Sequence, residues 1–152
     1  MRWVRIATPD QWGEFVTLVR EYGQMLPYSL EFQGWSQELE DPAAIYRSPG
    51  YALLAYDRSY PAGTVALKDL GHAIGEVKRL YVRPLYRGQH LGGQLLDRLM
   101  DEARTQGFRR LWLDTLPFMV SARRLYESRG FYEIPPYYDN PLPGVQYFEC
   151  RL

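Results

Sequence analysis

One stretch of the chain decides its fold: residues 76–93, which read EVKRLYVRPLYRGQHLGG. The apolar run from Gly75 to Val82 predicts a strand that ends at Arg83-Pro84. A glycine-bearing loop follows the strand and opens a helix. The start of a helix offers unpaired backbone N–H groups and the positive end of the helix dipole. This stretch therefore predicts a site for an anion, and a phosphate group would suit it.

The glycines of this loop have two readings. Gly88, Gly92 and Gly93 would let the backbone approach a bound ligand closely. The Gly-Lys-Ser/Thr ending of nucleoside-triphosphate loops is missing, so that class of site is excluded. A helix start that is simply capped can have the same form, so a purely structural role stays open.

The segments around this stretch predict one mixed α/β domain over residues 1–152. Thr8-Pro9-Asp10-Gln11 has the form of a capping box, which predicts a helix from Pro9 that Gly23 ends. Two more helices are expected, one from Gly92-Gly93 to Gly107 and one around Leu125 that Gly130 ends. The expected strands are 3–6, the hairpin 51–57 and 63–70, and then 75–82, 111–113, 131–134 and 145–152.

Residues 24–50 combine proline, glycine and aromatic side chains and predict a loop with a short helical piece near Ser36–Glu40. A loop of this length could face a substrate as a lid. Within residues 21–57 six acidic residues stand against Arg47 alone. This segment could therefore face a cation, although an acidic solvated surface is the plainer alternative.

Composition narrows the class of protein. The 152 residues are 46% hydrophobic, which excludes intrinsic disorder, and 18 basic and 18 acidic side chains cancel. A chain without net charge has no global field toward nucleic acid or an anionic membrane, so neither partner is expected. Cys150 is the only cysteine, which excludes a disulfide within the chain and fits a small buried side chain. No signal peptide or membrane span is evident, and we expect a cytoplasmic protein.

Two runs of sequence resemble a known family. Residues 78–92 resemble the acyl-CoA-binding signature Arg/Gln-x-x-Gly-x-Gly/Ala of the GNAT superfamily of N-acetyltransferases. Residues 122–131, ARRLYESRGF, are similar to a second stretch common there, Ala-x-x-Leu-Tyr-x-x-x-Gly-Phe. The resemblance covers residues 51–152. It implies a single-domain GNAT fold, with a mixed, mostly antiparallel sheet flanked by helices.

The resemblance also implies an activity, acyl-CoA-dependent N-acyl transfer, with acetyl-CoA as co-substrate and direct attack by an amine. A non-catalytic acyl-CoA-binding or sensor module is the alternative, because it would keep the loop and need no catalytic groups. Two positions depart from the family pattern: His90 stands where a glycine is usual, and Met119 where an asparagine is common. Histidine is among the non-glycine residues seen at positive φ. The matching positions that would bind the co-substrate are Leu80, Tyr81, Val82, Arg87, Gly88, Gln89, His90, Leu91, Gly92 and Gly93.

The catalytic candidates are Glu76 and Tyr126. An alkylammonium with a pKa of about 10.4 must lose a proton before it attacks, and Glu76 matches a catalytic glutamate of several GNAT enzymes. With an ordinary pKa of about 4.3 it would need burial or a water relay, and an ion pair with Lys78 or Arg79 is the structural alternative. Tyr126 matches the usual phenolic donor to the leaving thiolate, and its alternative is a core tyrosine.

The acceptor leaves fewer traces in the sequence. Tyr28, Phe32 and Tyr138, with Trp35 and Tyr137, lie in segments that flank the acyl site in similar folds, where they could hold a substrate or close the core. We assign Tyr28, Phe32 and Tyr138 to the substrate, a small-molecule or peptide amine. No metal site and no Ser-His or Cys-His system is expected. A homodimer is compatible with this interpretation.

Overall fold

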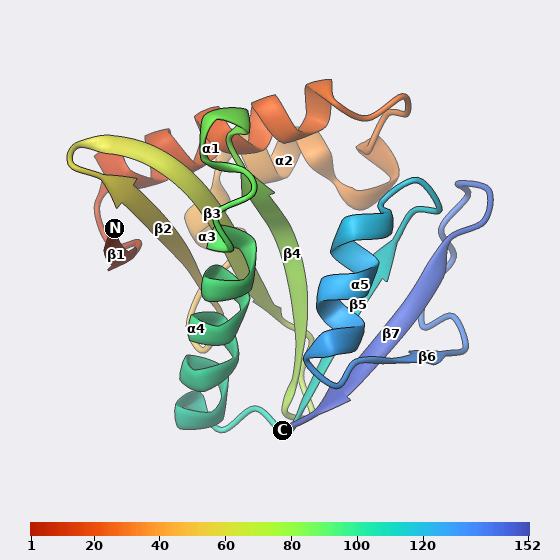
Figure 1. Cartoon of the computed structure of the whole chain (residues 1–152). Coiled ribbons are helices and arrows are strands. Elements are labelled where there is room, and N and C mark those ends of the chain that lie inside the picture. Colours follow the sequence, from red (N-terminus) through yellow and green to blue (C-terminus); the bar gives the residue numbers. More distant parts are fainter.

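One mixed sheet forms the centre of the computed structural model, which describes all residues 1–152 (Figure 1). Its seven strands lie in the order β1-β2-β3-β4-β5-β7-β6. They are β1 (Arg2–Arg5), β2 (Tyr51–Asp57), β3 (Tyr60–Asp69), β4 (Ile74–Val82), β5 (Arg110–Thr115), β6 (Tyr132–Ile134) and β7 (Gln146–Arg151). The helices are α1 (Pro9–Gln24), α2 (Trp35–Glu40), α3 (Pro42–Ile45), α4 (Leu91–Gln106) and α5 (Val120–Ser128), with short 3₁₀ turns η1 (Glu31–Gln33) and η2 (Pro84–Tyr86). The predicted α/β class and element order are confirmed.

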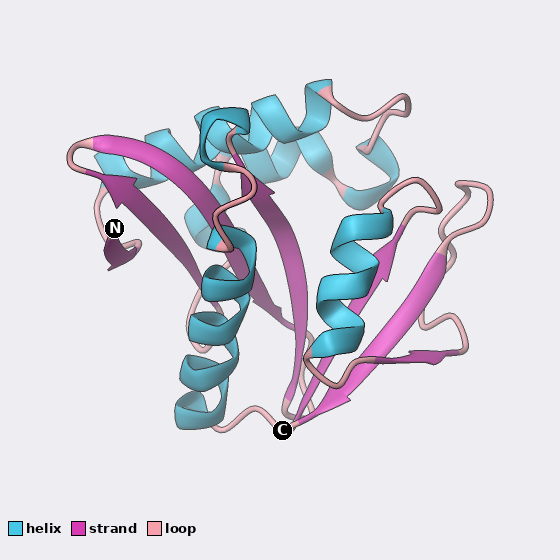
Figure 2. Ribbon diagram, in the orientation of Figure 1, coloured by secondary structure: helices cyan, strands magenta, loops and turns pink.

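Helices cover both faces of the sheet. Figure 2 shows α4 and α5 in front of it, with α1, α2 and α3 behind. Alternate residues of the central strands serve the two sides, as the period of a strand requires. On β3, for example, Val65 and Leu67 join the core beneath α4, while Ala66 joins the core beneath α1. No helix is long and apolar enough to span a bilayer.

The first helix begins where the sequence predicts. The Thr8 side chain accepts from Gln11 N, and the Gln11 side chain accepts from Thr8 N at 3.1 Å, so the capping box is complete. The expected end is one residue early, because α1 continues to Gln24. Gly23 serves packing instead: a Cβ there would lie 2.5 Å from the Trp35 ring.

The segment between α1 and β2 contains more structure than a loop. The expected helical piece is confirmed as α2, and η1 and α3 flank it. Glu38 and Tyr46 of this segment are buried, 2% exposed each. A buried segment of this kind acts as part of the wall behind β4 rather than as a free lid.

β4 and β5 separate after a short parallel contact, which creates the space for a site. They pair only from Ile74–Glu76 to Arg110–Trp112. Further along, the register between β3 and β4 shifts, and Arg79 adopts a left-handed conformation with φ 62°. A bulge of this kind bends a strand. In Figure 1 the two strands diverge from the end of the sheet near the C-terminus.

Candidate active site

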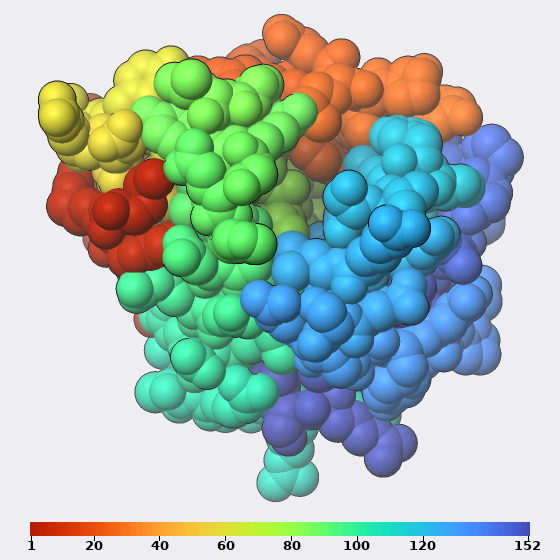
Figure 3. Space-filling model, viewed as in Figure 1, coloured from red at the N-terminus to blue at the C-terminus, as the bar shows by residue number.

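A cavity of about 520 Å³ fills the space between the separated strands. Its wall includes the outer half of β4 (77–82), the end of β5 with the following residue (114–116), α5 and the end of α1. The molecular surface is hollowed between α5 and the segment that leads into α4, with β4 at the floor (Figure 3). A volume of this size is typical of small-molecule sites.

The start of α4 borders this cavity, because Gly92 in its first turn is part of the cavity wall. The first α-helical hydrogen bond of α4 runs from Gln94 N to His90 O, so the N–H groups of Leu91, Gly92 and Gly93 have no acceptor within the chain. His90 caps the helix in a left-handed conformation, φ 62°, and its side chain makes no capping bond. Three unpaired N–H groups and the positive end of the helix dipole are features that suit an anion.

The backbone of β4 has one free edge along the cavity. Because β5 leaves β4 after Glu76, residues 78–82 have no strand partner on that side. A ligand with amide groups can pair with such an edge as an added strand would.

Tyr126 of α5 presents its hydroxyl to the cavity. The side chain is 8% exposed, its ring packs against Phe131 with 5.6 Å between centroids, and its hydroxyl makes no hydrogen bond within the chain. Burial raises the pKa of Tyr126 above its ordinary value of 10. The group is therefore protonated at neutral pH and able to donate.

A carboxylate also belongs to the cavity wall. Asp114 Oδ2 accepts from the Tyr138 hydroxyl and, at 2.9 Å, from Asn140 Nδ2. Its other oxygen, Oδ1, accepts no hydrogen bond from the protein. Gln33 holds the Tyr138 hydroxyl from the opposite side with Nε2 at 3.0 Å. Asp114 is thus fixed in position with one oxygen free.

Thr115, next along β5, has an unusual hydroxyl. The residue is 3% exposed, and its Oγ1 is the one buried side-chain polar atom without a hydrogen-bond partner. It also belongs to the cavity wall. Buried polar groups are nearly always paired, so this hydroxyl is an exception within the chain.

Comparison with known proteins identifies the family to which this chain belongs. The family model described as the Acetyltransferase (GNAT) family matches residues 15–131, which is most of the chain. This chain belongs to the GNAT acetyltransferase family.

Individual relatives agree with this assignment. A Schizosaccharomyces pombe protein named an uncharacterized N-acetyltransferase is 38% identical over 150 residues, 97% of this chain and 92% of its own. Two solved acetyltransferases share the fold. The one from Streptococcus agalactiae has a TM-score of 0.82 at 22% identity and covers 99% of this chain and 98% of its own. The one of the GNAT family from Staphylococcus aureus has a TM-score of 0.78 at 21% identity, with the same shares covered.

The predicted co-substrate residues of this GNAT acetyltransferase divide into two groups. Leu80, Tyr81, Val82, Arg87 and Gly92 belong to the cavity wall. The others, Gly88, Gln89, His90, Leu91 and Gly93, form the loop and helix start beside it. Their role in binding stays a prediction, and the structure gathers both groups at one end of the cavity.

Glu76 is buried and is not part of the cavity wall. Its Oε2 accepts from the Tyr137 hydroxyl at 2.6 Å, and its Oε1 is 3.7 Å from Lys78 Nζ. Burial and the charge of Glu76 raise the pKa of Tyr137, which keeps that hydroxyl a donor. Glu76 can therefore reach a substrate in the cavity only through an intervening group or water.

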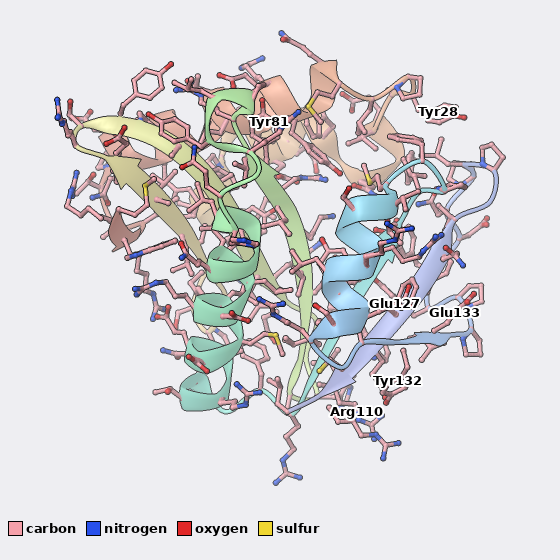
Figure 4. The ribbon with its side chains drawn as sticks, in the orientation of Figure 1. Tyr28, Tyr81, Arg110, Glu127, Tyr132 and Glu133 are labelled. Carbon is pink, nitrogen blue, oxygen red and sulfur yellow. The ribbon has the colours of Figure 1, made fainter.

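The aromatic residues assigned to the acceptor are dispersed. Tyr138 supports Asp114 from behind, while Tyr28 and Phe32 are 40% and 37% exposed and line no part of the main cavity. Figure 4 shows Tyr28 at the outer edge of the molecule, well apart from Tyr81 on β4. Their assignment to the substrate stays a prediction.

Sequence reasoning assigned no site role to seven polar residues of the wall: Gln33, Lys78, Arg79, Asp114, Thr115, Ser121 and Asn140. The predicted strand stopped at Leu113, whereas β5 continues to Thr115. Aspartate and threonine at the end of an apolar strand resemble the start of a turn, so the pattern held no signal for them.

Proposed function

We propose that this GNAT acetyltransferase transfers an acetyl group from acetyl-CoA to an amine by direct attack. The observation that carries this proposal is a single cavity bounded by the α4 N-terminus, the free edge of β4 and the Tyr126 hydroxyl. Each of the three fits one part of an acyl-CoA: a pyrophosphate, an amide-bearing chain and a thioester.

The polar groups of the cavity wall match the polar groups of the co-substrate. The N–H groups of Leu91, Gly92 and Gly93 would hold the pyrophosphate, and the edge of β4 would pair with the amides of the pantetheine arm. Met119 in the wall offers only its thioether where the family commonly has an amide.

The chemical step forms one bond and breaks another. The amine nitrogen attacks the thioester carbonyl carbon, the C–N bond forms, and the C–S bond breaks to release the CoA thiolate. A backbone N–H of residues 80–82 would stabilise the oxyanion. Tyr126 would give its proton to the thiolate and regain one from solvent, while the attacking nitrogen releases its remaining extra proton to solvent to give the neutral amide.

The amine must lose its proton before it attacks. We assign the removal of that proton to Glu76, through a water or the Tyr137 hydroxyl, because Glu76 is not part of the cavity wall. Asp114 is the carboxylate in the wall, and its free Oδ1 would hold the ammonium. The two carboxylates would then have separate tasks, one to position and one to accept a proton.

A screen tests the proposal. Purified protein with acetyl-CoA is given a panel of amines, and release of the CoA thiol is followed together with mass spectrometry of the acetylated product. Calorimetry of CoA alone serves as the binding control. We expect CoA to bind and at least one amine to be acetylated. Binding without turnover on any amine would favour the sensor alternative, and absence of CoA binding would contradict both.

A further inference from the structure

Lys78 is a buried cation that the proposed mechanism does not use. Its side chain is 11% exposed, belongs to the cavity wall, and donates no hydrogen bond to any group of the protein. The nearest carboxylate oxygen, Glu76 Oε1, is 3.7 Å from Nζ, beyond hydrogen-bond reach, and Glu76 is already bonded to Tyr137. Lys78 and Glu76 thus form an ion pair without a direct hydrogen bond, and the three N–H donors of the ammonium remain available to a ligand.

The ion pair with Glu76 contains no direct hydrogen bond, so it compensates only in part for the burial of the Lys78 ammonium. Burial, followed by the neighbouring charge of Arg79, lowers the pKa of Lys78. A cation that has lost most of its water gains strongly from a direct hydrogen bond to an anion. The protein supplies none, so the free side of Nζ suits an anionic group of a molecule in the cavity.

Arg79 and Arg87, the other cations of the wall, are engaged elsewhere. Arg79 is held by Glu38 at two points, and Arg87 donates to Val82 O at 2.9 Å. Asp114 contributes a negative charge to the same cavity wall, and its Oδ1 accepts no hydrogen bond from the protein. The cavity thus offers one buried cation without a direct hydrogen bond and one half-free anion, from the two strands that separate around it.

We propose that the acceptor is a zwitterionic small molecule, an amine with a carboxylate or similar anionic group, whose anion binds Lys78 and whose ammonium binds Asp114. This inference rests on the proposed acetyl transfer and narrows its substrate class. Amino acids are the simplest members of that class, and aminoalkylphosphonates present the same charges with a different anion.

Matched amines test the charge requirement. Each acid-bearing amine is compared with its uncharged analogue: 3-aminopropanoate with propylamine, and 4-aminobutanoate with butylamine; 2-aminoethylphosphonate is a separate arm. We expect kcat/KM to favour the charged member of each pair by about tenfold or more, as a charge-assisted hydrogen bond would give. The phosphonate arm shows which anion the site prefers.

Lys78→Met tests the residue itself, because it keeps the length of the side chain and removes the charge. The preference for the acid-bearing member should fall by about tenfold or more, mainly through KM. Lys68 is the only other lysine of the chain and lies outside the wall, so Lys68→Met is the matched control and should keep the parental preference. Melting temperature and CoA affinity establish that both variants are folded.

A direct readout does not depend on turnover. With only two lysines, the ¹³Cε signals can be assigned from Lys68→Met, and added 3-aminopropanoate should shift the Lys78 signal and leave the Lys68 signal in place. An unchanged preference in Lys78→Met, or equal activity on charged and uncharged amines, would overturn the inference while acetyl transfer stands. Failure to acetylate any amine would instead contradict the proposed function.

Discussion

Arg79 and Glu38 form a two-point ion pair inside the protein: Arg79 Nε lies 2.8 Å from Oε2 of Glu38, and Nη2 lies 2.7 Å from Oε1. Arg79 occupies the bulge of β4 in the cavity wall, and Glu38 belongs to α2. The Tyr46 hydroxyl donates to Glu38 Oε2 at 2.9 Å, so the carboxylate is held from two sides. This contact fastens the segment between α1 and β2 to the strand that forms the site.

Glu38→Ala should therefore destabilise the protein severely, because it leaves the Arg79 guanidinium buried and unpaired. Removing one partner of such a pair costs about 3–5 kcal/mol. For a chain of this size that corresponds to a fall in melting temperature of roughly 6–20 °C. Thermal unfolding followed by circular dichroism measures it. Glu40→Ala on the same helix removes an exposed carboxylate and should change little.

The same pair gives stability a defined pH dependence. Burial alone would raise the pKa of Glu38, but the hydrogen bonds and charge of Arg79 outweigh burial and hold that pKa below its ordinary value of 4.5. The folded state then binds fewer protons than the unfolded state near and below that value, so stability falls with decreasing pH. Its contribution is complete above the unfolded pKa and is lost as pH falls through the folded pKa.

Urea unfolding of the parent and Glu38→Gln at a series of pH values measures this effect. The free-energy difference between them should be constant at neutral pH and shrink below about pH 4.5, the unfolded value. A difference that stays constant down to pH 3 would contradict the assignment of Glu38 as the titrating partner.

This ion pair also marks the limit of what the sequence predicts. The capping box of Thr8 and Gln11 involves neighbours three residues apart, so local chemistry sufficed to place the start of α1. Glu38 and Arg79 are 41 residues apart, and the local sequence around either residue does not predict the other as its partner. The sequence does show the acidic excess of residues 21–57, which suggests a bound cation. In the structure two of these carboxylates instead pair with arginines of the same chain: Glu38 with Arg79 and Glu21 with Arg83.

The site shows the same division. Positions in the two family signatures, such as Val82, Gly92 and Tyr126, belong to the cavity wall, and a signature of this kind records a local conformation. Lys78 and Asp114 meet the same cavity only because β4 and β5 stop pairing after Glu76 and Trp112. The bulge at Arg79 lies just beyond the point of separation, and no period in the strand pattern predicts it.

Gly92→Asp should weaken CoA binding at the start of α4. The new carboxylate would stand beside the N–H groups that we assign to the pyrophosphate and repel it. Gly92→Ala is the matched control, since its Cβ would meet Leu125 and Val82 at ordinary contact distances of 3.7 and 3.9 Å. Calorimetry with CoA should give a much larger loss for aspartate than for alanine. Equal affinities of the two folded variants would remove the helix start from the binding site.

Glu76→Gln should slow acetyl transfer at neutral pH by roughly 10²- to 10⁴-fold, the range of general base catalysis, since the amide cannot take the amine's proton. The deficit should shrink at alkaline pH, where more of the amine arrives deprotonated. Tyr137→Phe removes the hydroxyl that donates to Glu76 and leaves the carboxylate in place. If the proton passes through that hydroxyl, both variants lose rate; if it passes through water, only Glu76→Gln does. Parental rates for Glu76→Gln from pH 6 to 9 would exclude Glu76 as the base.

Tyr126→Phe separates catalysis from packing more cleanly than any other change in this site. The phenyl ring can keep its contact with Phe131, and the lost hydroxyl has no hydrogen bond within the chain, so melting temperature should barely change. Turnover should fall by roughly 10²-fold or more at neutral pH, because the CoA thiolate would leave without a proton donor. Tyr60→Phe, at an exposed tyrosine on β3, is the matched control and should keep parental turnover.

The pH profile of Tyr126→Phe decides between proton donation and a merely structural role. Near and above the thiol pKa, about 8.5 for an ordinary thiol, the thiolate is stable without protonation, so a missing donor matters less. The deficit should therefore shrink as pH rises from 7 to 9, while burial keeps the pKa of Tyr126 in the parent above 10 and its proton in place across that range. A rate loss caused by defective packing would not depend on the ionisation of the thiol. A deficit of constant size across this pH range would therefore indicate that Tyr126 has only a structural role in the cavity wall. Parental turnover at neutral pH would remove it from the mechanism.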